Sequence, residues 1–389
     1  MASPYHLLNT SWTSHRLSPL HYEINQDSGP ESLLTFKAAL DTYAARLRDH
    51  LTNSLAGAGG PTLQHDPATS TTLGALQSCT WEAISSLSFL SPDPVSQDGN
   101  GSAMEQNQEE PAGLLITLTY ENATYKAALL GPGSVSRSQS QSQEQTQKKR
   151  KRGRPSMKSS IMTVSASIHL PLLLTRLPKP LRESLISFLS SNFDTYVSAL
   201  RISSQDLCGV LESYTSGLTP AGAVNASVDV EEIIRELHLT LSFAPPIAPS
   251  LKALNVNITR ETVGSFIPSP RSTSGGSSVL SGLSAYLSKH LAMELGLPLP
   301  AGEAAAATGS SLVGGYVRLT RIACAGFVVT SEGRLKIVAR GDGRAGGGRE
   351  DDERNRGALR GGEALLKAVL ERARNGMSSE FRGHAEKQH

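Results

Sequence analysis

Cysteine is scarce in this chain of 389 residues. Its three cysteines, Cys79, Cys208 and Cys324, lie far apart, with no CxxC pair and no set that could build a disulfide framework. The ten histidines are scattered along the chain, and no CxxC pair accompanies any of them. We therefore expect buried, reduced thiols and no metal site.

Long apolar runs and catalytic signatures are also missing. No stretch of about 18 apolar residues could span a membrane, and the N-terminal MASPYHLLNTSW lacks the basic and apolar regions of a signal peptide. The sequence contains no HExxH, GxSxG, Walker A or EF-hand pattern. We expect an intracellular protein without membrane contact, enzyme activity, cofactor or small-molecule substrate.

One nucleotide-binding pattern does occur, formed by Gly341, Gly343 and Gly346 in GDGRAGGGRE. A dinucleotide site needs an apolar helix to begin there, so that its N-terminal amides face the pyrophosphate. The next residues, GREDDERNRG, include four consecutive acids that would repel phosphate, and no second strand follows. We interpret these glycines as a surface loop.

Patterned segments alternate with low-complexity ones along the chain. LHLTLSF (237–243) alternates apolar and polar residues, which is typical of a strand in an antiparallel sheet with one open face. Two apolar runs around Glu121-Asn122-Ala123-Thr124 predict a hairpin, and helical spacing predicts helices near 31–51, 180–192, 203–214, 280–297 and 363–374. The predicted fold is α+β: a curved, mostly antiparallel sheet with helices packed on one side, interrupted by disordered insertions.

Changes in composition predict four regions. An N-terminal α/β part with the hairpin covers 1–130, a disordered insertion rich in Ser, Gln, Lys and Arg covers 131–160, and a C-terminal α+β part covers 161–340. The remainder, 341–389, combines a Gly-rich charged loop, a terminal helix and a tail.

The most unusual segment is KKRKRGRPSMK (148–158), which holds seven basic residues and no acid. Without it, the 37 Lys and Arg against 35 Asp and Glu become 30 against 35, so the basic character is local. Arg152-Gly153-Arg154-Pro155 is the core of an AT-hook. The A·T minor groove is narrow and negative and attracts inserted arginines, Gly153 permits close approach, and Pro155 keeps Arg154 extended.

The residues around this core add positive charge, which can contact phosphates but does not distinguish between DNA sequences. Phosphate contact or nuclear import is the expected role of Lys148, Lys149, Arg150, Lys151 and Lys158. A solvated linker with neither role is the alternative. A single hook binds weakly, so it would assist a second binding surface.

A second basic set is predicted on the C-terminal strands. The set consists of Arg318, Arg321, Arg334, Lys336 and Arg340. If these residues share one face of the sheet, they would form a basic patch that could bind DNA. Otherwise they are ordinary solvated residues of a sheet face.

Several patterned segments together resemble the fungal CENP-L proteins, inner-kinetochore subunits of the Sim4-type complex or constitutive centromere-associated network. The segments that carry the resemblance are LLNTSWTSHRLSPL, SCTWEAISSLSFL, LLITLTYENATYKAALL, LPLLLTRLPKPLRESLISFLSSNFDTYVSALRI, ELHLTLSFAPPIAPSLKALNVNI and LSAYLSKHLAMELGL. The resemblance skips residues 91–111, 131–160 and the tail after about 340, and the AT-hook-like tract is not part of the family pattern.

The resemblance implies a non-enzymatic scaffold that forms a heterodimer with a CENP-N-like protein and works with other inner-kinetochore subunits beside centromeric DNA or the centromeric nucleosome. It implies an α+β fold, location in the nucleus at the centromere and kinetochore, and pairing through the C-terminal sheet, here strands 235–243 and 313–339. An AT-hook-containing chromatin or transcription regulator is the alternative function.

Overall fold

The computed structural model describes residues 2–24, 33–56, 74–90, 111–132, 164–218, 231–243, 250–266, 279–291, 317–339 and 349–385. Its helices are η1 (Pro4–Leu7), α1 (Lys37–Ala56), α3 (Lys179–Phe193), α4 (Ser204–Leu218), α6 (Arg260–Gly264), α7 (Val279–Leu291) and α8 (Arg349–Ala385). The strands that precede α4 are β1 (Trp12–Leu17), β2 (Leu20–Ile24), β3 (Leu76–Ile84), β4 (Gly113–Tyr120), β5 (Thr124–Leu130), β6 (Val164–Ile168), β7 (Leu172–Arg176) and β8 (Val197–Ala199). Those that follow it are β9 (Leu237–Phe243), β10 (Ala253–Ile258), β11 (Val317–Ala323), β12 (Phe327–Thr330) and β13 (Arg334–Ile337).

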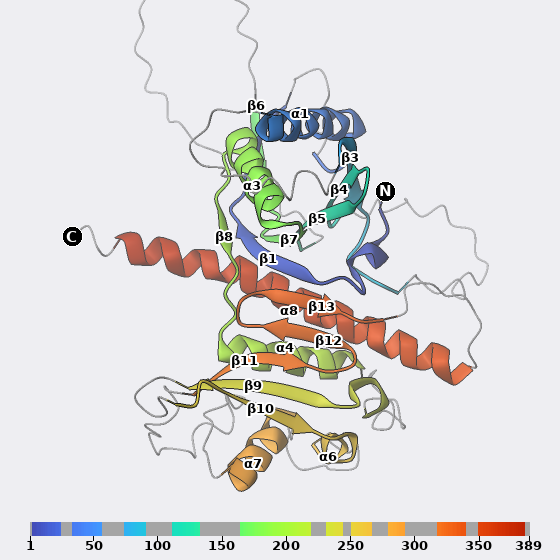
Figure 1. Ribbon diagram of the computed structural model, residues 1–389, viewed down its shortest axis with the longest axis vertical. Helices are drawn as coiled ribbons and strands as arrows, with labels where there is room; N and C mark the ends of the chain where they lie inside the picture. The colour runs from blue at the N-terminus through green and yellow to red at the C-terminus, as the bar shows by residue number, and fades with distance from the viewer. Residues whose placement is uncertain are drawn as a thin grey trace, which may run out of the picture.

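One large sheet runs through most of the molecule (Figure 1). Its 11 strands follow the order β10-β9-β11-β12-β13-β1-β7-β5-β4-β3, with β8 beside β1, and the paired strands are antiparallel. β1 is the central strand, because it pairs with β7 on one side and with β13 and β8 on the other. β2 and β6 form a separate two-stranded sheet. The predicted α+β class with a mostly antiparallel sheet is confirmed.

The sheet carries helices on opposite faces in its two parts. In β7, Leu172 and Leu174 point into a cluster that includes residues of α4 and α8, while Leu173 points the other way into a cluster with α1 and α3. This division follows from the period of two along a strand. Beyond β1, strands β9 to β13 bury their apolar side chains against α4, α7 and α8.

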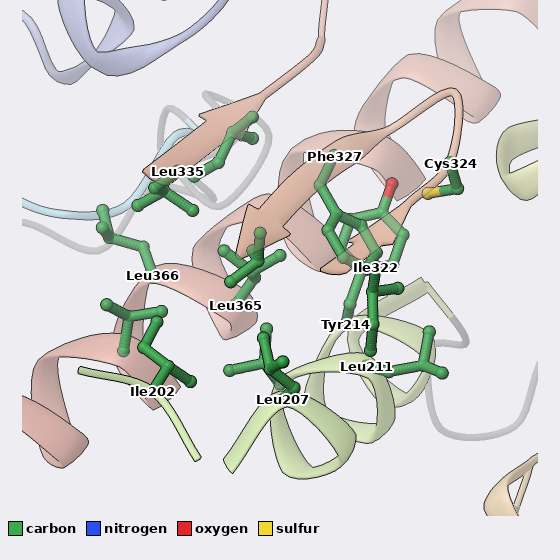
Figure 2. Close-up of a cluster of buried hydrophobic side chains, with 14 of the residues drawn as sticks. Ile202, Leu207, Leu211, Tyr214, Ile322, Cys324, Phe327, Leu335, Leu365 and Leu366 are labelled. Atoms are coloured by element: carbon green, nitrogen blue, oxygen red, sulfur yellow. The ribbon is translucent and has the colours of Figure 1, made fainter. Parts of the chain in front are cut away.

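The long helix α8 joins the two parts of the sheet. It has 37 residues, which corresponds to about 55 Å, and in Figure 1 it crosses behind β1 and β13. Figure 2 shows how α4, α8 and the strands share one core, in which Leu207, Leu211 and Tyr214 meet Ile322, Phe327, Leu335, Leu365 and Leu366. Full burial of each such side chain stabilises the fold by roughly 1.5–3 kcal/mol.

Close packing explains the glycines within α8. A Cβ on Gly361 would touch the Tyr214 ring, and one on Gly362 would touch Ile337. Glycine is needed at these two positions because the helix lies so close to α4 and β13 that a side chain would not fit. This close packing outweighs the low helical propensity of glycine.

Most predicted elements are found in the structure. The hairpin is β4–β5, and the alternating segment is β9. The terminal helix is longer than predicted, because it begins at Arg349 rather than near residue 363. The three glycines 341, 343 and 346 lie outside the described residues.

The strands also cross the limits predicted from composition. β6 and β7 follow the 131–160 segment in the chain, yet β7 pairs with β1 and β5, which precede it. The division into regions 1–130, 131–160, 161–340 and 341–389 remains a proposal about chain organisation, and nearly all of 131–160 lies outside the described residues.

Candidate interaction surface

Strands β9 to β13 leave one face of the sheet uncovered by described helices, and we call it the open face. Along β9, Leu237, Leu239 and Leu241 are buried under the helices, so the residues between them point outward. The cross-strand register extends this outward set to the other strands. The open face comprises His238, Thr240, Ser242, Ala253, Asn255, Asn257, Arg318, Arg321, Ala323, Val328, Thr330, Arg334 and Lys336.

A β-bulge brings two of the arginines together. In a regular strand, Arg318 and Arg321 would point to opposite faces, because they are three residues apart. The register between β11 and β9 shifts between Leu319 and Arg321, so Arg318 pairs with Ser242 and Arg321 pairs with Thr240. Both arginines are exposed on the open face. A bulge that redirects a side chain in this way is a common device at binding surfaces.

The open face is basic. Arg334 and Lys336 lie on β13, two strands from Arg318 and Arg321, and none of the four forms an ion pair within the described part of the chain. None of its outward strand positions is an acid. By the strand register these four residues lie on the same face of the sheet, and their use as a DNA-binding patch stays a prediction. Arg340 lies outside the described residues.

Arg201 extends the basic surface and was not predicted. Its neighbours Leu200 and Ile202 are buried in the core with α4, so the exposed Arg201 points the other way. Backbone hydrogen bonds from Leu200 to Ser14 and from Ile202 to Ser331 hold this segment beside the β12–β13 turn. The alternation in ALRI was a signal for this placement, but its nearness to β13 was not visible in the sequence.

Hydrogen bonds fix the polar side chains of the open face. The Thr240 hydroxyl donates to Asn255 Oδ1 over 2.9 Å, and the Arg334 amide donates to Thr330 Oγ1 over 3.1 Å. Within the described part of the chain, the guanidinium groups of Arg318 and Arg321 take part in none of the side-chain hydrogen bonds or ion pairs, which leaves them for a partner.

β10 forms one end of the sheet. It pairs with β9 alone in the described part of the chain, and its exposed residues are Ala253, Asn255 and Asn257. β10 contains none of the lysines or prolines that commonly prevent a strand edge from pairing further. Its backbone is therefore suited to accept another strand.

His15 and Arg182 mark the border between the open face and the part covered by α3. His15 is buried on β1, with Nε2 3.4 Å from Thr175 Oγ1. Burial, and secondarily the nearby Arg182, lower the pKa of His15 to about 4. The ring is therefore neutral at pH 7 and adds no charge to the basic surface.

The three cysteine thiols are protonated at neutral pH and therefore weakly reactive. Burial raises the pKa of Cys79 and of Cys208 to about 12 and that of Cys324 to about 11. Since the thiolate is the nucleophile and the metal ligand, these thiols are not poised for either role at neutral pH. The described residues contain no group of His, Cys, Asp and Glu that could hold a metal ion.

Among the described helices, none is long and apolar enough to cross a bilayer.

A cleft of about 460 Å³ lies between α8 and the segment that follows β3. Glu363 on its wall accepts hydrogen bonds from Lys367, at 2.6 Å, and from the Ser88 hydroxyl, at 3.0 Å. The Glu363 carboxylate on this wall is thus paired with the Lys367 ammonium group and the Ser88 hydroxyl.

The AT-hook-like core Arg152, Gly153, Arg154 and Pro155 lies outside the described residues, together with the flanking basic residues of 148–158. Their assignment stays a prediction from the sequence.

The described surface offers a strand with one unpaired edge, β10, and a basic sheet face, which are features of a protein that binds other macromolecules. The family model for CENP-L, centromere protein L, matches residues 6–374. This chain belongs to the CENP-L family, and it is a kinetochore-related centromere protein. Among curated proteins, none matches its sequence significantly.

Proposed function

We propose that the protein is a non-enzymatic scaffold subunit of the inner kinetochore that forms a heterodimer with a CENP-N-like chain. In this role it works with other inner-kinetochore subunits in the nucleus, beside centromeric DNA or the centromeric nucleosome, and supports kinetochore assembly and chromosome segregation. The observation that carries the proposal is the edge of β10, which no strand of the described part of the chain occupies, beside an open sheet face in a CENP-L chain.

The edge of β10 supports pairing by strand addition. An added strand forms main-chain hydrogen bonds along the edge, while alternate side chains of both strands decide specificity. Asn255 and Asn257 are exposed and uncharged, so they would lie beside the partner without a desolvated charge.

Co-expression with a CENP-N-like chain, followed by size-exclusion chromatography, tests the pairing. We expect a stable one-to-one complex. The double variant Asn255→Lys/Asn257→Lys should weaken it, because lysines on an edge strand oppose further pairing. The matched control is Ser78→Lys/Thr80→Lys on β3, the opposite end of the sheet, which should leave the complex intact. Equal loss with both double variants, or no complex with the wild-type chain, would count against the proposal.

The basic open face supports an accessory contact with DNA. The side chains of the open face that can neutralise backbone phosphates, without distinguishing between DNA sequences, are Arg318, Arg321, Arg334 and Lys336.

Residues 148–158 would add nuclear import and a minor-groove contact. Arg152→Ala/Arg154→Ala should reduce binding to A·T-rich duplex more than Lys148→Ala/Lys149→Ala does. Equal loss on A·T-rich and G·C-rich duplexes would reduce the hook to a generic basic tract.

The alternative function, an AT-hook-containing chromatin or transcription regulator, makes a different prediction about location. A centromeric scaffold should be restricted to centromeres in cells. Binding along whole chromosomes, without co-purification of a CENP-N-like chain, would favour the regulator.

A further inference from the structure

A row of hydroxyl and cationic side chains crosses the N-terminal strands on the face opposite to α1 and α3. The register places Thr80 of β3 opposite Thr117 of β4, Thr117 opposite Lys126 of β5, and Lys126 opposite Arg176 of β7. All four are exposed or half-buried. Direct cross-strand neighbours have Cβ atoms about 4.5–5.5 Å apart, so the four side chains form one continuous line, which we call the Thr–Lys–Arg row.

Two like charges stand directly opposite each other in this row. Lys126 and Arg176 are cross-strand partners, and neither forms an ion pair within the described part of the chain. Like charges in this arrangement destabilise a sheet. The arrangement is therefore unfavourable unless an anion lies between the two side chains.

His6 lies beside the row and does not neutralise its positive charge. Its Nδ1 lies 3.2 Å from Lys126 Nζ. Burial, and secondarily Lys126, lower the pKa of His6, so the neutral ring accepts a hydrogen bond from the ammonium group. Lys126 thus gains an orienting contact from η1.

We propose that the Thr–Lys–Arg row binds the phosphate of a phosphoserine or phosphothreonine in a partner protein. The Arg176 guanidinium can donate two parallel hydrogen bonds to one phosphate, the Lys126 ammonium adds a second positive charge, and the Thr117 hydroxyl adds a further donor. A phosphoryl group carries about −1.5 to −2 charges at pH 7, which matches the two cations that Lys126 and Arg176 place at directly opposite strand positions.

The surroundings favour a short phosphorylated segment over nucleic acid. Glu82 lies close enough to His6 to affect its protonation, and it is two residues from Thr80 on the same strand face. This acid would repel the further phosphates of a duplex. The next row, formed by Ser78, Thr119 and Thr124, is uncharged. It suits the polar backbone of a peptide more than a polyanion.

The row is also separate from the basic open face. Lys126 shares its strand face with Ala128, which packs in the cluster that contains α4 and α8. Arg318 and Arg321 point away from that cluster. A duplex bound to the open face would thus lie on the other side of the sheet, so the two surfaces can be tested independently.

The test uses the full chain and two probes. The first is inorganic phosphate, compared with chloride at equal ionic strength, with the melting temperature as the readout. The second is a degenerate peptide library with a fixed phosphothreonine, compared with its unphosphorylated twin in retention on immobilised protein. We expect phosphate to raise the melting temperature and the phosphorylated library to be retained at least five-fold better.

Lys126→Gln/Arg176→Gln should abolish both effects, while Arg318→Gln/Arg334→Gln on the open face should preserve them. The Lys126→Gln/Arg176→Gln variant should melt no lower than the wild type without phosphate, since the like-charge repulsion is gone; if it does not fold, Lys126→Gln alone replaces it. Equal retention of both libraries overturns the proposal. The proposal is also overturned if Lys126→Gln/Arg176→Gln loses as much affinity for a 20-base-pair duplex as Arg318→Gln/Arg334→Gln does. That result would identify the row as a nucleic-acid contact.

Discussion

The Ser14 hydroxyl donates a 2.7 Å hydrogen bond to the carbonyl of Gly333, 319 residues further along the chain. The Ser14 amide donates to the same carbonyl over 2.8 Å, and the Ser14 carbonyl accepts from the Leu200 amide. These bonds fasten the turn between β12 and β13 to the central strand β1. They join the part of the sheet with the open face to the part covered by α1 and α3.

Gly333→Ala should weaken this junction. Gly333 has φ +79°, and a Cβ there would collide with the Leu200 carbonyl and the Ser14 hydroxyl. We expect a loss of about 1–3 kcal/mol in the free energy of unfolding, measured by urea denaturation. Gly209→Ala is the control, because a Cβ on this α4 residue meets nothing within 4 Å; it should stabilise by roughly 0.5–1 kcal/mol. An unchanged stability of Gly333→Ala would contradict the role of the turn.

The elements that the sequence predicted are those with local patterns. β9 and the β4–β5 hairpin show their alternation directly, and α3 shows its apolar face. The first part of α8 could not be predicted, because Gly357, Gly361 and Gly362 resemble helix breakers until the neighbours that require them are known. The shared face of Arg318 and Arg321 depends on a bulge that leaves no mark in composition. The Ser14–Gly333 junction depends on long-range pairing, which no local pattern encodes.

Tyr214→Phe should leave the protein as stable as the wild type or more so. The Tyr214 ring packs against Phe327 with centroids 4.6 Å apart, and its buried hydroxyl has no hydrogen-bond partner in the described part of the structure. Burying an unpaired hydroxyl costs about 1–3 kcal/mol, so its removal keeps the ring packing and avoids that cost. Tyr5→Phe is the control: its hydroxyl donates to the Phe89 carbonyl over 2.8 Å, and we expect a loss of about 1 kcal/mol. A larger loss in Tyr214→Phe than in Tyr5→Phe would refute this reading.

His15 should make the protein sensitive to acid. Its pKa is about 4 in the folded chain, mainly because of burial and secondarily because of Arg182, and 6.5 is the ordinary value. The unfolded chain therefore takes up this proton more readily, so the stability contributed by neutral His15 is complete above pH 6.5 and is lost as the pH falls through 4. We expect a loss of about 2 kcal/mol from this group. Urea denaturation at pH 7, 5.5 and 4.5 measures it.

The control for this prediction removes the contribution of other titrating groups. His15→Gln should show a smaller decrease in stability between pH 7 and 4.5 than the wild type, whatever its stability at pH 7. His238→Asn, which changes an exposed histidine on the open face, should keep the wild-type decrease. Parallel curves for the wild type and His15→Gln would show that another group causes the acid sensitivity.

Arg318→Ala/Arg334→Ala should weaken DNA binding and reduce its salt dependence. If each arginine neutralises one phosphate, the slope of log K against log salt becomes less negative by about 1.8, because each phosphate contact in B-DNA contributes about 0.9. Fluorescence anisotropy with A·T-rich and G·C-rich duplexes at several salt concentrations measures the slope. The loss should be equal on both duplexes, because backbone contacts do not read sequence. Arg46→Ala/Arg48→Ala on α1, at the other end of the molecule in Figure 1, removes the same charge and should leave the slope unchanged. Identical slopes for the two double variants would mean that net charge, rather than the open face, governs binding.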